Sequence, residues 1–272
     1  MKLHVATGPS TTSFDIKTVC VVGLGYVGLP TACMFAKAGL KVIGVDVNER
    51  IVERLKAGEV TIIEPGLAEL VKCLVESKQL TASNKVQPAD AFIVAVPTPF
   101  RHDGTHAPDV SYIESAIRAI AKVANKGNLI ILESTSPVGT TRHIMKVLHS
   151  ARPDLQVATP DGNEGDIDFA YSPERVIPGS TTQEIVHNDR VIGGVTARSA
   201  ERALALYKMF VIGKCHVTDD KTAELVKLAE NAYRDVNIAY ANELSVMCDR
   251  FGVDLWQLIE LANRHPRVSI LA

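Results

Sequence analysis

The sequence has no excess of either charge and no long apolar segment. Its 272 residues carry a formal net charge of −2, whereas a nucleic-acid-binding domain normally displays a basic patch. No apolar run approaches the roughly 20 residues that a membrane-spanning helix needs. The sequence therefore predicts no nucleic-acid partner and no membrane partner.

The first residues lack the pattern of a secretory signal. Residues 1–15 contain neither the basic block nor the apolar block of a signal peptide. We therefore expect a polar N-terminal tail and a cytoplasmic protein. The length, with 46% apolar and 22% charged residues, predicts a sizeable core in one large domain or about two.

Cysteine is scarce. The five cysteines are Cys20, Cys33, Cys73, Cys215 and Cys248. Their number is odd, and no Cys-x-x-Cys pair or cysteine–histidine cluster occurs, so neither a disulfide framework nor a metal site is predicted. We expect each to serve as a small hydrophobic residue that is buried or half-buried.

Apolar strands and helices alternate from residue 16 onward. We expect strands over residues 16–22, 41–46, 91–96, 128–133, 157–158, 169–172, 190–194 and 215–217. We expect helices over residues 30–38, 48–57, 67–77, 111–124 and 197–211. This alternation predicts βαβ units, and the nearly all-apolar third strand indicates that both sheet faces are covered. The predicted fold class is α/β, a Rossmann-like, doubly wound and mostly parallel sheet.

The pattern changes at residue 219. Residues 219–250 read as one helix of about 32 residues, or about 48 Å, which is long for a globular protein. A shorter helix is expected over residues 254–263. We therefore expect three parts: the tail over residues 1–15, a nucleotide-binding domain over 16–218 and a helical segment over 219–272.

A Gly-x-Gly-x-x-Gly motif follows the first strand and opens the first helix, and an aspartate lies 18 residues past its end. Gly23 permits a tight turn, Gly25 lets the backbone approach a pyrophosphate, and Gly28 allows the helix to pack closely on the strand. The N–H groups of the helix start, at Tyr26 and Val27, can receive phosphates. A dinucleotide site is therefore predicted, and a glycine-rich turn without a ligand is the alternative.

Asp46 ends the second strand. Its carboxylate can accept hydrogen bonds from a ribose 2′-hydroxyl and would repel a 2′-phosphate, which favours NAD over NADP. Arg50 lies four residues later, where arginine can hold a phosphate or stack on adenine, so this residue weakens the preference slightly.

Two threonines follow the third and fourth strands. Ligands of open α/β sheets bind at the carboxyl ends of strands, which places Thr98 and Thr135 where a cofactor ribose or nicotinamide would lie. Capping of the next helix is an equal alternative for both.

Five ordered segments resemble the UDP-glucose/GDP-mannose dehydrogenase family. These segments cover residues 23–30, 96–99, 133–140, 171–176 and 227–231. The resemblance extends over about residues 16–271. Residues 263–267 and the Ser-Pro-Glu-Arg-Val form of the fourth segment are most similar to the branch that acts on UDP-N-acetyl-D-mannosamine.

The resemblance implies a function. Members oxidise the C6 alcohol of a UDP-sugar to a carboxylate with two NAD, through an aldehyde and a cysteine thioester, and the branch implies surface polysaccharide synthesis. It also implies a homodimer formed through the helix over 219–250, so that 219–272 begins an all-α dimerisation segment. A non-catalytic NAD-binding module, another UDP-sugar 6-dehydrogenase and a 3-hydroxyacid-type dehydrogenase are the alternatives.

Lys227, Asn231 and Arg234 share one face of the long helix because their spacing is i, i+4 and i+7. An ammonium and an amide that converge on one spot can stabilise an oxyanion. The resemblance implies that Lys227 is catalytic with Asn231 as its partner, both also contacting substrate, and that Arg234 contacts substrate. A solvated stripe in which Glu224 and Glu230 serve as partners is the alternative.

The resemblance also gives roles to residues in the sheet domain. Glu174 would handle a proton or position water, and Thr135 would act in catalysis. Arg175 and Val176 would touch the nucleotide sugar, and the planar fork of arginine suits a diphosphate. An exposed Glu–Arg pair without a function is the alternative.

The resemblance to the mannosamine branch implies that His265 and Arg267 contact substrate. An ordinary surface position near the end of the chain is the alternative. His102, His106 and His143 match no motif, so we expect them at the surface.

The family's nucleophilic cysteine and a further nucleotide-binding domain would follow residue 272. Cys248 is expected in a helix, without the neighbours that activate a nucleophile. We therefore expect this chain to bind NAD without completing the oxidation.

Overall fold

The computed structural model describes residues 16–101, 103–159, 163–177 and 179–271. The expected tail over residues 1–15 and the surface position expected for His102 lie outside the described residues. The chain divides into two compact units, one up to Glu224 and the other from Leu225 onward.

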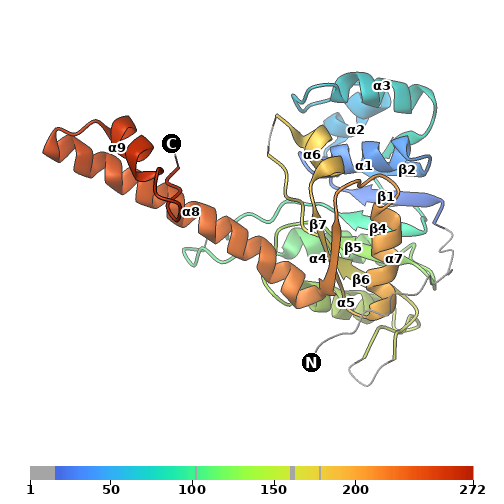
Figure 1. The fold of residues 1–272 in the computed structure, drawn as a ribbon. Helices are drawn as coiled ribbons and strands as arrows, with labels where there is room; N and C mark the ends of the chain where they lie inside the picture. Colours follow the sequence, from blue (N-terminus) through green and yellow to red (C-terminus); the bar gives the residue numbers. More distant parts are fainter. Residues whose placement is uncertain (1–15, 102, 160–162, 178, 272) are drawn as a thin grey trace. The chain divides into compact units, whose positions relative to one another are not determined.

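The first unit is built on one eight-stranded sheet with the order β3-β2-β1-β4-β5-β6-β7-β8 (Figure 1). Its strands are β1 (Thr18–Val22), β2 (Lys41–Val45), β3 (Leu80–Ser83), β4 (Ala91–Val94), β5 (Leu129–Leu132), β6 (Asp168–Tyr171), β7 (Arg190–Gly194) and β8 (Cys215–Asp219). Neighbouring strands are parallel except β6 and β7, which are antiparallel. The predicted Rossmann-like, mostly parallel α/β fold is confirmed.

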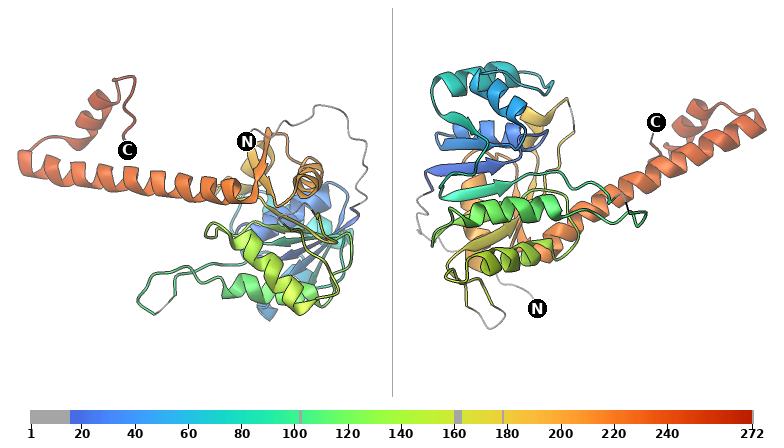
Figure 2. Two further views of the ribbon diagram at one scale, coloured as in Figure 1. Left: turned by 90° about the horizontal axis from the view of Figure 1, so that it is seen from below. Right: turned by 180° about the vertical axis from the view of Figure 1, so that it is seen from behind.

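Helices cover both faces of this sheet (Figure 2). They are α1 (Gly28–Lys37), α2 (Glu49–Lys56), α3 (Leu67–Glu76), α4 (Ser111–Ala121), α5 (Thr140–Ala151), α6 (Thr181–His187) and α7 (Ala197–Tyr207). Successive strand residues point to opposite faces, so Val19 and Val21 join the core beneath α1, α3 and α7, while Cys20 and Val22 join the core beneath α4 and α5. The all-apolar inner strands are explained by this double covering.

Several elements differ from the expectation. Residues 157–158 form no strand and belong to the loop before β6. The structure adds β3, α5 and α6, which were not predicted. β3 is a short edge strand with only one buried residue, so its sequence carries little apolar alternation.

The second unit contains most of α8 (Asp220–Phe251) and all of α9 (Leu255–Ala262). The expected long helix is confirmed, and it stops where Gly252 adopts a positive φ of 66°, a common way to end a helix. The Asp254 side chain caps α9 by accepting from the Gln257 N–H at 2.7 Å. Within the described ranges, none of the helices has the length and apolar character needed to cross a membrane.

Candidate cofactor and substrate site

The glycine turn after β1 has no room for side chains at two of its three glycines. A Cβ on Gly23, whose φ is +96°, would lie 2.5 Å from the Ala95 carbonyl oxygen, and one on Gly28 would lie 1.8 Å from the Gly23 oxygen. A Cβ on Gly25 would meet nothing within 4 Å. The first and third glycines are therefore required by packing, and the second faces open space that a ligand can fill.

The start of α1 suits an anion. Its N-cap, Val27, supplies no capping side chain, and the first turn contains no acidic residue. The first N–H groups of a helix have no partner within the helix and lie at the positive end of its dipole. Together with the half-exposed Tyr26, this turn has the geometry that receives a phosphate.

Asp46 is held at the carboxyl end of β2. Its Oδ2 accepts from the Leu24 N–H at 2.9 Å, and its Oδ1 accepts from the Asn48 N–H at 2.9 Å. These bonds fix the carboxylate beside the glycine turn, where it can still accept from a ribose hydroxyl. Arg50 lies in the first turn of α2, is exposed and donates its own N–H to the Asn48 side chain at 3.0 Å.

A cavity of about 460 Å³ lies next to Gly23 and Asp46. Aliphatic groups line much of it, namely Val45, Val47, Val86, Val96, Ala116, Ala119 and Val123. An apolar slot beside one fixed carboxylate suits an adenosine. Sequence reasoning gave these residues no role in a cofactor site, although Val47 directly follows the strand predicted over residues 41–46 and Val96 ends the strand predicted over residues 91–96.

Thr98 and Thr135 lie together. The Thr98 Oγ1 donates to the Thr135 carbonyl oxygen at 2.6 Å. The N-caps of α4 and α5 are Val110 and Gly139, so the alternative that these threonines cap the next helices is wrong. The bond joins the loops after β4 and β5 beside the cofactor cleft.

Glu174 is 7% exposed, so the alternative of an exposed Glu–Arg pair is wrong for this residue. Its Oε1 accepts from the Arg175 N–H at 2.7 Å, and its Oε2 accepts from the Arg190 guanidinium at 2.5 Å. Arg175 is partly exposed and donates to the Asp189 carbonyl oxygen at 3.1 Å. Val176 is partly buried and packs against the core.

A second buried carboxylate, Glu133, lies behind Glu174. Its Oε1 accepts from the Tyr207 hydroxyl at 2.7 Å and from the Arg190 guanidinium at 3.2 Å. Burial raises the pKa of Glu133 to about 7, Arg190 opposes this rise, and the negative Glu174 adds to it. The roles of Glu133 and Arg190 were not predicted from the sequence, because contacts between distant strands have no local pattern.

The second unit carries the predicted polar face of α8. Lys227 and Asn231 are partly buried, and Arg234 is exposed. Glu224 is not a solvated partner in this stripe: it is fully buried in the first unit and accepts from the Gly139 N–H at 2.5 Å and the Thr141 N–H at 2.7 Å. That part of the solvated-stripe alternative is wrong.

His265 and Arg267 lie in an exposed turn after α9. The Arg267 N–H donates to the His265 Nδ1 at 3.3 Å. The Asn263 side chain holds this turn by exchanging two hydrogen bonds with the Ile270 backbone, at 2.7 and 3.0 Å. His106 and His143 are exposed, as expected.

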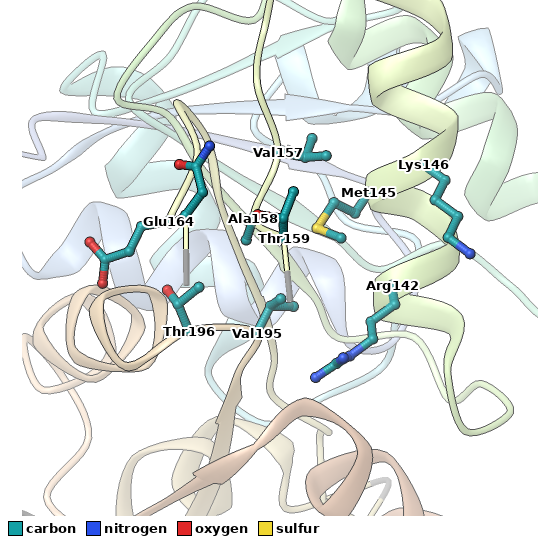
Figure 3. Close-up of a pocket in the computed structure, with 10 residues that line it drawn as sticks. Arg142, Met145, Lys146, Val157, Ala158, Thr159, Glu164, Val195 and Thr196 are labelled. Carbon is teal, nitrogen blue, oxygen red and sulfur yellow. The ribbon is translucent and has the colours of Figure 1, made fainter. Parts of the chain in front are cut away.

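A larger cavity, about 800 Å³, lies elsewhere in the first unit (Figure 3). It is lined by α5 and by the loops before β6 and after β7, with Arg142, Lys146 and Thr196 among its residues. It contains no residue from the glycine turn or the loops after β4 and β5, so it is not part of the cofactor cleft.

Metal chemistry needs a metal-binding group of side chains, and thiol chemistry needs an activated cysteine thiol. In the described part of the chain, no group of three or more histidine, cysteine or acidic side chains is placed to hold a metal ion. Burial raises the pKa of Cys20 to about 11 and that of Cys33 to about 12. Neither Cys20 nor Cys33 therefore provides the low-pKa thiolate that nucleophilic catalysis needs. Cys248 is buried within α8. Cys73 is exposed on α3, so the burial expected for that residue is wrong.

Comparison with known proteins agrees with this geometry. Residues 17–211 match the NAD binding domain of the UDP-glucose/GDP-mannose dehydrogenase family, and residues 221–271 match the central domain of that family. A UDP-N-acetyl-D-mannosamine dehydrogenase from Campylobacter jejuni is 55% identical over 253 residues, covering 93% of this chain and 62% of the relative.

Two further relatives also match most of this chain with only part of their own length. An NDP-N-acetyl-D-galactosaminuronic acid dehydrogenase from Ralstonia nicotianae is 53% identical, covering 94% of this chain and 60% of the relative. The structure of a UDP-D-ManNAc dehydrogenase from Pyrococcus horikoshii aligns with a TM-score of 0.87 at 40% identity, covering 94% of this chain and 59% of that one. The chain thus spans about 60% of the length of these relatives.

Proposed function

Because the chain belongs to the UDP-glucose/GDP-mannose dehydrogenase family, we propose that it binds NAD and serves the oxidation of a UDP-sugar C6 alcohol to the uronic acid. The observation that carries the proposal is the cleft formed by the glycine turn, the uncapped start of α1 and the fixed carboxylate of Asp46. NAD held there would supply the hydride acceptor, and the residues of the cleft would bind and orient it.

The cleft favours NAD over NADP. The Asp46 carboxylate would accept from the 2′-hydroxyl of the adenosine ribose and repel a 2′-phosphate. Gly23, Gly25, Tyr26, Val27 and Gly28 would surround the pyrophosphate. Thr98 and Thr135 would lie toward the nicotinamide ribose, since both follow strands whose carboxyl ends face the cleft.

We propose UDP-N-acetyl-D-mannosamine as the substrate. The match to relatives of that name at 55% identity supports it, as does the turn that presents His265 and Arg267. A relative at 53% identity is named for an N-acetyl-D-galactosaminuronic acid, so the galactosamine analogue is the second candidate. Both candidates are N-acetylated hexosamines.

Each proposed site residue has a chemical role. Lys227 and Asn231 would stabilise negative charge on the C6 oxygen, and Glu174 would handle a proton or position water. Arg234, His265 and Arg267 would contact the UDP-sugar. The pair Arg175–Val176 would contact it as well, while Thr135 would act beside the nicotinamide. The thioester step is not assigned to a cysteine of this chain.

We also propose that two copies associate through α8. Five exposed apolar side chains, Tyr233, Val236, Tyr240, Met247 and Phe251, repeat at helical spacing on one face of this helix. Lys227, Asn231 and Arg234 lie on the other face by the same 3.6-residue period. A continuous exposed apolar face is typical of an interaction surface, and it leaves the polar face available to substrate.

Calorimetric titration with NAD and NADP tests the cofactor proposal. We expect NAD to bind at least about tenfold more tightly, which is about 1.4 kcal/mol. Absence of NAD binding would overturn the proposal.

The substrate is tested by adding UDP-N-acetylmannosamine, UDP-N-acetylgalactosamine, UDP-glucose and a 3-hydroxy acid separately to the NAD-loaded chain. We expect the mannosamine nucleotide to bind most tightly. Binding and oxidation of the 3-hydroxy acid alone would support the competing dehydrogenase class.

A further inference from the structure

We propose that Arg190 is a positioning residue for Glu174, and that the buried carboxylate of Glu133 competes with Glu174 for the same guanidinium group. This inference rests on the proposed function of Glu174 in handling a proton or positioning water. It concerns residues of the first unit only.

The reversed direction of β7 brings Arg190 to the site. Tyr171 of β6 pairs with Gly193 of the antiparallel β7. Continuing that register by three residues places Arg190 opposite Glu174. Because Arg190 is the first residue of β7, it lies at the edge where β5 and β6 end and where Glu133 also lies. In a parallel strand it would lie at the other edge.

The guanidinium group bridges the two carboxylates. One terminal nitrogen donates to the Glu174 Oε2 at 2.5 Å, and the other donates to the Glu133 Oε1 at 3.2 Å and to the Ser172 Oγ at 3.3 Å. Its central carbon lies 4.2 Å from the centre of the Tyr207 ring. The planar fork of arginine can hold several acceptors in fixed directions, so these contacts define where the Glu174 carboxylate lies.

Charge balance makes the arrangement sensitive to one proton. Glu133 and Arg190 are 3% and 4% exposed, and Glu174 is nearly as buried. Two ionised carboxylates would share a single cation, and an uncompensated buried charge is costly. One carboxylate therefore holds a proton more readily than an exposed glutamate does.

Glu133 is the carboxylate that is enclosed on all sides. Thr31 of α1 donates to its Oε2 at 3.2 Å, and Tyr207 of α7 donates to its Oε1 at 2.7 Å. The charged groups that face it are Arg190 from β7 and Glu174 from the loop after β6. Burial, opposed by Arg190 and supported by the charge of Glu174, raises its pKa to about 7.

The protonation of Glu133 then decides how Arg190 is shared. Below the pKa of Glu133 the side chain is neutral, and Arg190 pairs with Glu174 alone. Above this pKa Glu133 is ionised and draws the guanidinium toward itself. The backbone N–H of Arg175 donates to the Glu174 Oε1 at 2.7 Å. Its chemical shift should therefore change when the contact between Arg190 and Glu174 changes.

The test follows the amide chemical shift of Arg175 by ¹⁵N–¹H NMR from about pH 5.5 to 8.5, the range around the raised pKa. In the wild-type chain we expect a sigmoidal change of this chemical shift, called the step below, with its midpoint near pH 7. Glu133→Gln is isosteric, cannot ionise and should abolish the step. Arg190→Lys keeps the charge but loses the fork, and it should reduce the step.

Two control variants test whether a group other than Glu133 produces the step. Imidazole also titrates near neutral pH, and the His216 Nε2 lies 3.0 Å from the Asp189 side chain, whose backbone Arg175 contacts. His216→Gln must therefore keep the step, as must Glu201→Gln at an exposed position of α7.

A step that persists in Glu133→Gln overturns the inference, and so does a step that disappears in His216→Gln or is absent from the wild type. If either Glu133 or Arg190 variant fails to fold, a side-chain ¹³C titration of Glu133 in the wild-type chain decides instead. A pKa of Glu133 in the ordinary glutamate range overturns the inference. Calorimetry with NAD and UDP-sugars tests the proposed function separately, since failure to bind these ligands does not alter this titration.

Discussion

At the residue scale, Asp46 is the side chain on which the proposed preference for NAD over NADP depends. Replacing it with asparagine keeps the size but removes the charge. We expect NAD affinity to fall roughly tenfold, since a hydrogen bond to a charged group contributes about 1.5–3 kcal/mol, and the preference over NADP to shrink. Calorimetry measures both changes.

Glu49→Gln is the matched control for Asp46, because it removes an exposed acid from the adjacent first turn of α2. Equal NAD affinity in Asp46→Asn and the wild type would contradict the assigned role.

Glu64 is a buried carboxylate with a structural task. It accepts from the Gly179 N–H at 2.6 Å and from the Thr181 N–H and Oγ1 at 3.2 and 2.8 Å, and so supplies the cap that the Ser180 side chain does not give α6. Burial alone would raise the pKa of Glu64, but these hydrogen bonds outweigh burial and lower it.

The lowered pKa of Glu64 gives a pH-dependent stability. A depressed folded-state pKa stabilises the protein above the ordinary glutamate pKa, and this contribution is lost as the pH falls through the folded value. We expect Glu64→Gln to lower the free energy of unfolding by about 1–2 kcal/mol at pH 7 and by less in acid. Urea unfolding at several pH values measures this, with the exposed Glu76→Gln as control. A loss that is independent of pH would argue against the ionised cap.

At the scale of elements, the first two turns of α8 are fixed to the start of α5. The Glu224 carboxylate accepts from the Gly139 N–H and from the Thr141 N–H and hydroxyl, and the fully buried Asp220 pairs with Arg142 at 2.8 and 3.0 Å. Because the α5 N-cap is a glycine without a capping side chain, a carboxylate from a distant segment completes this helix end.

Removing that carboxylate should destabilise the first unit. In Glu224→Ala three donors lose their acceptor, two of them buried and one partly buried, and each buried unsatisfied group costs about 1–3 kcal/mol before relaxation. We expect a loss of roughly 2–4 kcal/mol after water has replaced part of the contact. The urea midpoint followed by circular dichroism measures it, and Asp249→Asn at an exposed position of α8 should leave it unchanged. An unchanged midpoint in Glu224→Ala would show that the anchor is dispensable.

At the scale of the whole molecule, the apolar face of α8 predicts association. Val236 and Tyr240 lie one turn apart on that face and are 67% and 54% exposed. We expect Val236→Asp with Tyr240→Asp to weaken the dimer at least about tenfold, because charges would replace apolar contacts. Sedimentation over a range of concentrations measures the change.

Asp249→Asn, on the opposite face of the helix, is the control for association. A wild-type chain that stays monomeric at every concentration tested would exclude α8 as a dimer contact.

The sequence by itself determined the alternating α/β architecture, the glycine turn, the position of Asp46 and the length of α8. These features are local: a positive φ, a buried strand or an amphipathic period leaves its pattern in neighbouring residues. The edge strand β3 went unpredicted because its own apolar pattern is weak, with one buried residue, and α6 is only seven residues long. Helix α5 carries Ile144, Met145, Val147 and Leu148 at helical spacing, so its local pattern could have predicted it.

Only the tertiary structure decided which distant polar groups meet. Glu64, Glu133 and Glu224 each find their partners more than 50 residues away, and no local pattern encodes such pairs. The antiparallel direction of β7 is the clearest case, since it places Arg190 between Glu133 and Glu174. A strand's sequence pattern fixes which faces are buried, but its direction is chosen by packing and by the connections between elements.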